Sequence, residues 1–199
     1  RSFTQSRDVP SPNRKGVPNS KNMELVVATK NKKKLREIKE ILSDLNLKVT
    51  SLMDYLRPPH ILENGKTFKE NAIKKAVKIS RFTGKLTLGE DSGLEVEALK
   101  GAPGIYSSRF SGIPACRTGR DKNDLKNNLK LLKLLNDSPL KKRKARYVCA
   151  VALADKDGLV GVVEGRCSGL IGFELKGNFG FGYDPLFIIP KYRKTFAQL

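Results

Sequence analysis

The segment from Ala145 to Cys167 constrains the fold most, because it predicts one long β-hairpin. Its letters, ARYVCAVALADKDGLVGVVEGRC, are rich in valine and contain one cluster of turn-forming residues. Asp157 and Gly158 form a pair that is typical of tight hairpin turns, so we expect the chain to reverse there. An antiparallel pair of strands is therefore expected in the sheet.

Upstream of the hairpin, the patterns predict a strand and two helices. A buried strand is expected over residues 24–29, and apolar residues at helical spacing predict a helix over 31–45. Thr67 and Glu70 match a capping box, which predicts that a second helix begins after Thr67. Its inward-facing residues are expected to be Ala72, Ile73, Ala76, Val77 and Ser80.

The middle of the chain predicts a strand, a loop and a third helix. A strand over 86–89 is expected to end at an acidic step, and an alternating segment over 94–98 follows. Residues 100–112 are punctuated by glycine and proline and predict a loop. The third helix is expected to have Asp121 as its N-cap and a face formed by Leu125, Leu129, Leu132 and Leu135. This order predicts an α/β fold with a mixed central sheet and flanking helices.

Length and composition indicate one folded domain. Of 199 residues, 39% are hydrophobic and 30% are charged, as in soluble globular proteins rather than disordered ones. Apolar runs stay short of the roughly 18 residues of a membrane span, so no membrane partner is expected. The three cysteines, Cys116, Cys149 and Cys167, form no CxxC pair, which favours reduced thiols and a cytoplasmic location.

Residues 1–22 differ from the rest of the chain in composition. They carry three prolines, five basic residues and one acidic residue, which predicts a flexible basic extension before a domain over 23–199. Because the extension contains arginine and serine but almost no acids, an organelle import sequence remains the alternative.

The charge and the histidine content limit the kinds of partner and of catalytic group that this chain can have. Lys and Arg outnumber Asp and Glu by 39 to 20, which favours a polyanionic partner: nucleic acid, a phosphorylated small molecule or an anionic membrane surface. His60 is the only histidine and follows two prolines, which argues against a Ser-His-Asp or Cys-His apparatus and excludes a histidine-rich zinc site. Carboxylates, lysines and a hard metal ion are left to carry any reaction.

The first candidate site is VVATKNKKK, where a buried strand is followed within a few residues by a helix. This geometry directs backbone N–H groups and the positive end of the helix dipole at one point, and Lys30, Lys32, Lys33 and Lys34 add positive charge. The segment lacks the P-loop pattern. It predicts an anion site, and a solvated lysine-rich first turn is the alternative.

The second candidate is the acidic step, Glu90 and Asp91, with Ser92 and Gly93 after it. Mg²⁺ binds one or two carboxylates together with water and substrate phosphates, and such an acid can also deprotonate an attacking water. Opposite a lysine-rich phosphate cradle, these residues suit a metal–nucleotide site. The alternative is a pair of solvated acids at a strand end.

The third candidate is GNFGFGYDPLF, residues 177–187. Its three glycines are interleaved with Phe179, Phe181 and Tyr183, which suggests a pliable loop with exposed aromatic faces for a planar base. Asp184 is then placed to accept hydrogen bonds from ring N–H groups. The alternative is a tight turn whose aromatic rings fill the core.

Four segments together resemble one family. ATKNKKKLREIKEIL, TFKENAIKKA, GEDSGLEVEALKGAPGIYSSRFSG and GFGYDPLFI follow one another in the order and spacing of the inosine/xanthosine triphosphate pyrophosphatases. The resemblance runs from about Met23 to the last residue. It implies Mg²⁺-dependent homodimers with an elongated, two-lobed α/β fold and a nucleotide cleft. Such enzymes hydrolyse ITP, dITP and XTP to the monophosphate and pyrophosphate.

The resemblance also implies roles for single residues. Thr29, Asn31 and Lys34 would form a triphosphate cradle, supported by Lys30, Lys32 and Lys33. Asp91 would be the general base and a metal-linked carboxylate, with Ser92 as a substrate contact. Glu63 would be the second metal ligand, with Asp54 as its rival. Phe181, Gly182, Tyr183 and Asp184 would form the base pocket, with Phe181 stacked on the purine.

The sequence departs from the family pattern at two places. Glu90 stands where the family usually has Asp, which keeps a carboxylate on a longer arm. The family also continues beyond the KTFAQL that ends this sequence, with a nucleotide-binding Ser-His-Arg segment that is expected to be missing. Two other functions remain: a septum-inhibitor-like nucleotide pyrophosphatase with other substrates, and a basic nucleic-acid-binding protein.

Overall fold

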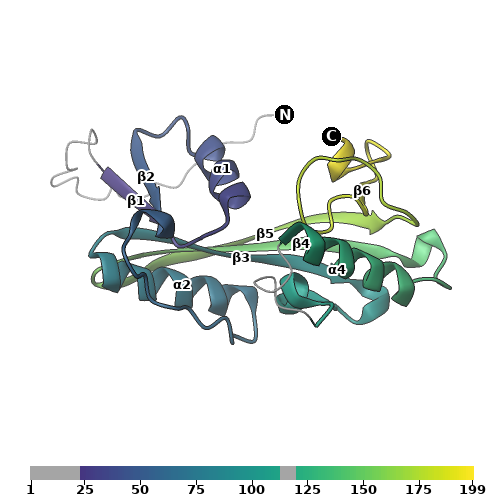
Figure 1. Cartoon of the computed structure of the whole chain (residues 1–199), viewed down its shortest axis with the longest axis horizontal. Coiled ribbons are helices and arrows are strands. Elements are labelled where there is room, and N and C mark those ends of the chain that lie inside the picture. The colour runs from purple at the N-terminus through teal and green to yellow at the C-terminus, as the bar shows by residue number, and fades with distance from the viewer. Residues whose placement is uncertain (1–22, 113–119) are drawn as a thin grey trace, which may run out of the picture.

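The computed structural model describes residues 23–112 and 120–199 of the chain. The predicted extension over residues 1–22 and Cys116 lie outside the described residues. Within them, the strands form one mixed sheet with helices around it, which confirms the predicted fold class (Figure 1). None of the helices in these two ranges combines the length and apolar character that crossing a bilayer requires.

Seven strands form the described sheet, in the order β2-β1-β3-β4-β5-β6-β7. β1 runs parallel to β2 and β3, and all later neighbours pair antiparallel. The short strands β2, β6 and β7 are not predicted by the sequence patterns. The bounds are β1 Met23–Val27, β2 Leu47–Ser51, β3 Leu86–Val96, β4 Lys144–Asp155, β5 Gly158–Ile171, β6 Phe187–Ile189 and β7 Lys194–Thr195.

The predicted hairpin is the β4–β5 pair, but its turn lies one residue earlier than expected. Asp155 pairs with Gly158, so the loop residues are Lys156 and Asp157. The Asp155 carboxylate accepts hydrogen bonds from the N–H groups of Asp157 (2.8 Å) and Gly158 (3.1 Å). This side chain therefore fixes the turn, because it satisfies two loop donors at once.

The first two predicted helix starts are confirmed, because each depends on local capping chemistry. α1 spans Lys32–Ile41, and Asn31 is its N-cap. α2 spans Phe68–Thr83, and the Thr67 side chain accepts a hydrogen bond from Glu70 N at 3.1 Å. The prediction that the first helix reaches residue 45 is wrong, since the chain leaves α1 to enter β2.

α4, Arg120–Leu134, corrects two predictions for the third helix. The helix already begins at Arg120, so Asp121 is not its N-cap. Leu125 and Leu129 are about half exposed, whereas three asparagines and two leucines are buried on the packed face: Asn123, Asn127, Asn128, Leu131 and Leu135. The asparagines are buried because neighbouring loops offer them backbone hydrogen-bond partners.

β3 continues through the acidic step, so the predicted strand end at Glu90 and Asp91 is wrong. β4 pairs with β3 as far as Val96, whereas β1 pairs only as far as Leu88. Side chains alternate between the two faces of a strand. Asp91 therefore lies on the side of α2, which we call the α2 face, and Glu90 on the opposite α1 face. Figure 1 shows α1 and α2 on opposite sides of the long strands.

Gly89 allows α2 to lie against the sheet. A Cβ at position 89 would overlap the backbone atoms Ala72 O and Ala76 N of α2. Small residues on both elements complete this contact, since Ala72 and Ala76 pack on Ala150 and Ala152 of β4. The close approach brings the same helix within reach of Asp91.

Gly89→Ala is expected to lower the free energy of unfolding by about 1–3 kcal/mol, because added volume in a packed contact forces backbone shifts. Urea unfolding followed by circular dichroism measures the change. Gly165→Ala is the matched control, because Gly165 also lies within a strand and its added Cβ would meet nothing within 4 Å. Equal stability of the two variants would contradict the packing argument.

Candidate active site

The start of α1 lies directly after β1 and holds a buried, unused donor. Asn31 Oδ1 accepts a hydrogen bond from Lys33 N (3.1 Å), and Asn31 N donates to Thr29 Oγ1 (3.1 Å). The side-chain Nδ2 of Asn31 is buried and has no hydrogen-bond partner within the described chain. A buried donor without an acceptor costs free energy, and a helix N-terminus favours anions. The loop therefore suits an anionic acceptor such as a phosphate oxygen.

Lys34 and Glu90 form an ion pair on the α1 face. Lys34 Nζ lies 2.7 Å from Glu90 Oε2 and 2.9 Å from Ser92 Oγ. Burial acts to raise the pKa of Glu90, but the Lys34 ammonium and its hydrogen bond outweigh burial, so the pKa lies below its ordinary value. The neighbouring Cys149 thiol has its pKa raised by burial to about 12, so it is not a nucleophile at neutral pH.

The other cradle lysines lie apart from this pair. Lys33 Nζ donates to the backbone carbonyl of Gly180 at 3.2 Å, which joins α1 to the loop over 177–187. Lys30 and Lys32 are exposed. The structure thus brings Lys33 and Lys34 to other parts of the candidate site and leaves Lys30 and Lys32 at its surface.

Asp91 belongs to a buried cluster on the α2 face. Lys75 Nζ lies 3.0 Å from Asp91 Oδ1, 2.7 Å from Glu63 Oε1 and 2.9 Å from the backbone carbonyl of Glu90. Asn71 Nδ2 donates to Asp91 Oδ2 at 3.0 Å. Both oxygens of the Asp91 carboxylate are therefore held by side chains of α2, four residues apart on one face of the helix.

Burial shifts the two charged partners in this cluster differently. It raises the pKa of Asp91, and the opposing effect of the Lys75 ammonium is smaller. Burial would lower the pKa of Lys75, but the carboxylates of Asp91 and Glu63 outweigh it and raise that pKa. An acid whose pKa is raised toward neutrality is suited to accept a proton during a reaction.

The two clusters meet at the open edge of β3 beyond the end of β1. Ala28 N still donates to Leu88 O at 2.8 Å, and the chain then turns away from the sheet. The next carbonyl on that edge, Glu90 O, is reached by Lys75 from α2. The carboxyl ends of parallel strands next to a change in strand direction are common ligand sites in α/β sheets.

The loop over 177–187 is held in one conformation by its own side chains. Asp184 Oδ2 accepts from Phe181 N (2.8 Å), and Asp184 Oδ1 accepts from Tyr147 OH (2.9 Å). Phe179 is 74% exposed and Phe181 is partly buried. The expectation of accessible aromatic rings holds for these two residues.

Tyr183 differs from its predicted place. Its ring is only 3% exposed and packs in a core cluster with Leu186 and Phe187, while its hydroxyl donates to Ser107 O at 2.9 Å. The prediction of an exposed Tyr183 face is therefore wrong. The core needs a large ring beside Leu186, and an alternating loop pattern does not show which ring it takes.

The carboxylates beside Lys75 fit a magnesium ion in part. The described residues contain no group of three or more His, Cys, Asp or Glu side chains able to hold a metal ion. Mg²⁺ needs only one or two carboxylates when water and phosphates complete its shell. Asp91 and Glu63, which contact one ammonium, match that requirement, whereas Asp54 accepts hydrogen bonds from Ser51 as a helix cap.

Two residues of the site are absent from the sequence prediction. Asn71 and Lys75 are 1% and 7% exposed, which is rare for such polar side chains. A signal was present in the sequence, because Lys75 falls within the buried stripe of α2 that includes Ala72, Ala76 and Ile79. A lysine at such a position requires a buried carboxylate partner.

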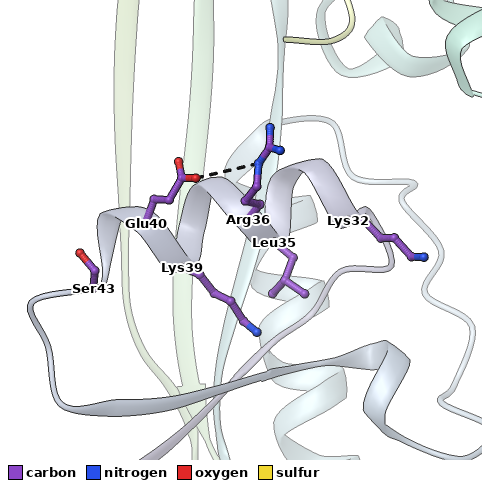
Figure 2. Close-up of a pocket in the computed structure, with 6 residues that line it drawn as sticks. All are labelled: Lys32, Leu35, Arg36, Lys39, Glu40 and Ser43. Carbon is purple, nitrogen blue, oxygen red and sulfur yellow. Dashed lines mark ion pairs between the residues drawn. The ribbon is translucent and has the colours of Figure 1, made fainter. Parts of the chain in front are cut away.

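A hollow of about 420 Å³ lies on another side of α1 and is not part of this site (Figure 2). Residues of α1 and the turn after it line it, among them Leu35, Lys39 and Ser43. Neither Lys34 nor Asp91 belongs to its wall. The candidate active site is defined instead by the clusters around Lys34 and Lys75.

Known proteins are similar to this chain in both sequence and fold. The dITP/XTP pyrophosphatase of Desulforamulus reducens is 49% identical over 177 residues, which are 89% of this chain and 85% of the relative. The protein of the same name from Exiguobacterium sibiricum is 47% identical, with 89% and 86% covered. A HAM1 protein from Coxiella burnetii has a TM-score of 0.77 at 36% identity, over 89% of this chain and 87% of that one.

The family comparison covers nearly all of the described structure. The model of the Ham1 family matches residues 25–199, a range that contains the cradle, the acidic step and the aromatic loop. The predicted resemblance is thereby confirmed, and the chain belongs to the Ham1 family.

Proposed function

We propose that this protein is a Mg²⁺-dependent nucleoside triphosphate pyrophosphatase that acts on deaminated purine nucleotides: ITP, dITP and XTP. The observation that carries the proposal is the buried Asp91, held by Asn71 and Lys75 beside the open edge of β3. The names of the relatives, dITP/XTP pyrophosphatases, support the choice of substrate.

The cradle binds the triphosphate through the start of α1. The free Nδ2 of Asn31 donates to a phosphate oxygen, and the helix dipole favours the negative charge. Lys34, which is ion-paired with Glu90, places an ammonium group beside the cradle. A net charge of +19 also raises the rate of encounter with a polyanionic substrate.

Asp91 acts as the general base. It takes a proton from a water molecule whose oxygen bonds to phosphorus, while the phosphoanhydride between the α- and β-phosphates breaks. The bond's electron pair leaves with the phosphate oxygen, which gives a monophosphate and pyrophosphate. Asp91 and Glu63 would hold Mg²⁺, which supplies Lewis-acid stabilisation of charge on the phosphates. Lys75 and Asn71 keep the carboxylate in place.

Selectivity for the base follows from hydrogen-bond polarity. Hypoxanthine and xanthine carry a keto oxygen at position 6 and an N–H at position 1, where adenine has the opposite polarity. A pocket with a donor toward O6 and an acceptor toward N1 would leave both groups unpaired with ATP. GTP shares these two groups with ITP, so it must be rejected at its 2-amino group. Xanthine carries an oxygen at the same position, so the rejection there depends on hydrogen-bond polarity, because the amino group donates where the oxygen accepts.

A substrate panel tests the proposal. ITP and XTP are expected to release pyrophosphate with kcat/KM at least ~100-fold above that for ATP, with dGTP also poor. Release from ITP no faster than from ATP would refute the substrate assignment. A preference for modified pyrimidine nucleotides would instead identify a septum-inhibitor-like pyrophosphatase. Binding to DNA that weakens steeply with salt, without turnover, would favour the nucleic-acid-binding alternative.

We propose a homodimer in the cytoplasm as the working form. The free thiols of Cys149 and Cys167 suit a reducing compartment and support this location. Sedimentation of the purified protein tests the dimer, and a monomer at micromolar concentration would contradict it.

A further inference from the structure

We propose that Asp124 and Asn128 of α4 are positioning residues for base recognition, because they hold both backbone groups of Gly182. Gly182 N donates to Asp124 Oδ2 at 2.8 Å, and Asn128 Nδ2 donates to Gly182 O at 2.8 Å. We call this pair of bonds the α4 clamp. The inference rests on the proposed function, in which Phe181, the preceding residue, stacks on the purine.

The clamp completes the fixation of Phe181. The Phe181 N–H donates to Asp184 Oδ2 at 2.8 Å, and the clamp fixes the two peptide groups that precede and follow the Cα of Gly182. Gly182 has φ +62°, a left-handed conformation that glycine adopts as readily as others, so the glycine backbone by itself does not fix the direction of the loop. The direction of the Phe181 ring therefore depends on α4 as well as on Asp184.

The chemistry of the two clamp residues points to a role beyond stability. Asn128 is 3% exposed, and its Oδ1 has no hydrogen-bond partner among the described residues. A buried amide that leaves one atom unpaired costs much of what its other bond contributes. The hydrogen bond from Asn128 to Gly182 therefore contributes little to the free energy of unfolding. Its effect is to fix the position of the loop over 177–187. The Asp124 bond is charge-assisted and correspondingly strong.

The spacing of the clamp makes it rigid. Asp124 and Asn128 are four residues apart, so they lie on one face of α4. Leu131 of the same helix, and Leu135 directly after its end, belong to the core cluster that contains Tyr183, next to Gly182. The loop over 177–187 and α4 therefore pack into the same core cluster, and the clamp fixes the orientation of the loop relative to the helix.

The first test compares the changes in KM and in kcat for ITP when a clamp residue is replaced. Asn128→Ala and Asp124→Ala are expected to raise KM for ITP tenfold or more, while kcat changes less than threefold, because the base is misplaced and the cradle is intact. The inhibition constant of inorganic tripolyphosphate, which occupies only the phosphate cradle, should stay within twofold. Asp124→Asn keeps an oxygen acceptor and is expected to restore KM to within about threefold of wild type.

Asn123→Ala is the matched control. Asn123 is buried on the same helix but donates to Ser108 O (2.6 Å), away from the aromatic loop. Its loss is expected to leave KM for ITP unchanged. An equal rise in KM for the control variant, or a parallel rise in the tripolyphosphate constant, would overturn the positioning role in favour of general structural damage.

Amide hydrogen exchange tests the clamp independently of turnover. Asn128→Ala and Asp124→Ala are expected to increase exchange at least tenfold at Phe181 and Gly182, and Asn123→Ala should not. Unchanged exchange refutes the clamp. If wild-type protein releases no pyrophosphate from ITP, the proposed function fails, and this exchange comparison still decides whether α4 holds the loop. Faster exchange with an unchanged KM in an active enzyme overturns the link to base recognition.

Discussion

Asp91→Asn is expected to slow pyrophosphate release from ITP by about 10²–10⁴-fold, the usual contribution of a positioned general base. Asparagine has the shape of aspartate but cannot accept the proton. It also offers one oxygen where Lys75 and Asn71 both donate, so one of these donors loses its acceptor. A loss of stability of about 1–3 kcal/mol is therefore expected alongside the kinetic defect. Steady-state kinetics and urea unfolding measure the two effects separately.

Glu90→Gln is the informative comparison, because β3 places the two adjacent acids on opposite faces. Glu90 contacts Lys34 in the cradle, so its loss is expected to act on binding: KM for ITP should change more than kcat. A larger loss of kcat in Glu90→Gln than in Asp91→Asn would move the general base to the α1 face. Wild-type turnover by Asp91→Asn would remove Asp91 from the reaction altogether.

Local chemistry explains which parts of the fold could be predicted. The helix starts at Asn31 and Thr67 follow from side chains that cap their own neighbours. The hairpin follows from a strong strand pattern, although the Asp155 carboxylate moved its turn by one residue. Such features depend on a few adjacent residues, so the sequence contains all that is needed.

The features of the fold that the sequence did not predict depend on pairing between distant segments. Whether a strand stops at Glu90 depends on β4, whose residues lie more than fifty positions away, and β4 carries β3 through the acidic step. The faces of that strand then separate Glu90 from Asp91, which no reading of adjacent letters could show. The same holds for the buried asparagines of α4, since their partners are backbone groups of distant loops.

In the candidate site, too, residues with a local sequence pattern were predicted, and a residue that depends on distant partners was not. The sequence identified the helix start at Asn31 and the acid at Asp91 as candidates, because a helix cap and adjacent carboxylates can be recognised from a few neighbouring residues. Lys75 was not predicted, because most lysines on a helix are exposed and this one is identified only by the carboxylates around it. Its position within the apolar stripe of α2 was the one available sign.

Lys75→Met is expected to lower the free energy of unfolding by about 3–5 kcal/mol, the typical result of removing one partner from a buried ion pair. Methionine fills the space of the lysine stem, so the change isolates the ammonium. Without it, Asp91 keeps a buried charge, and the carbonyl of Glu90 loses its donor. Lys78→Met is the matched control, since Lys78 lies one turn away on the exposed side of α2. It is expected to shift stability by less than about 0.5 kcal/mol.

The double variant Lys75→Met with Asp91→Asn separates charge from packing. Removing both charges leaves no buried ion without a partner, so the double variant should be at least ~1 kcal/mol more stable than Lys75→Met alone. Strict additivity of the two single changes would mean that Lys75 and Asp91 do not interact, which contradicts their 3.0 Å contact.

Turnover of ITP should fall by about 100-fold or more in Lys75→Met, since the base loses the group that orients it. A stable Lys75→Met protein with undiminished turnover would show that the buried ammonium serves neither the fold nor the reaction.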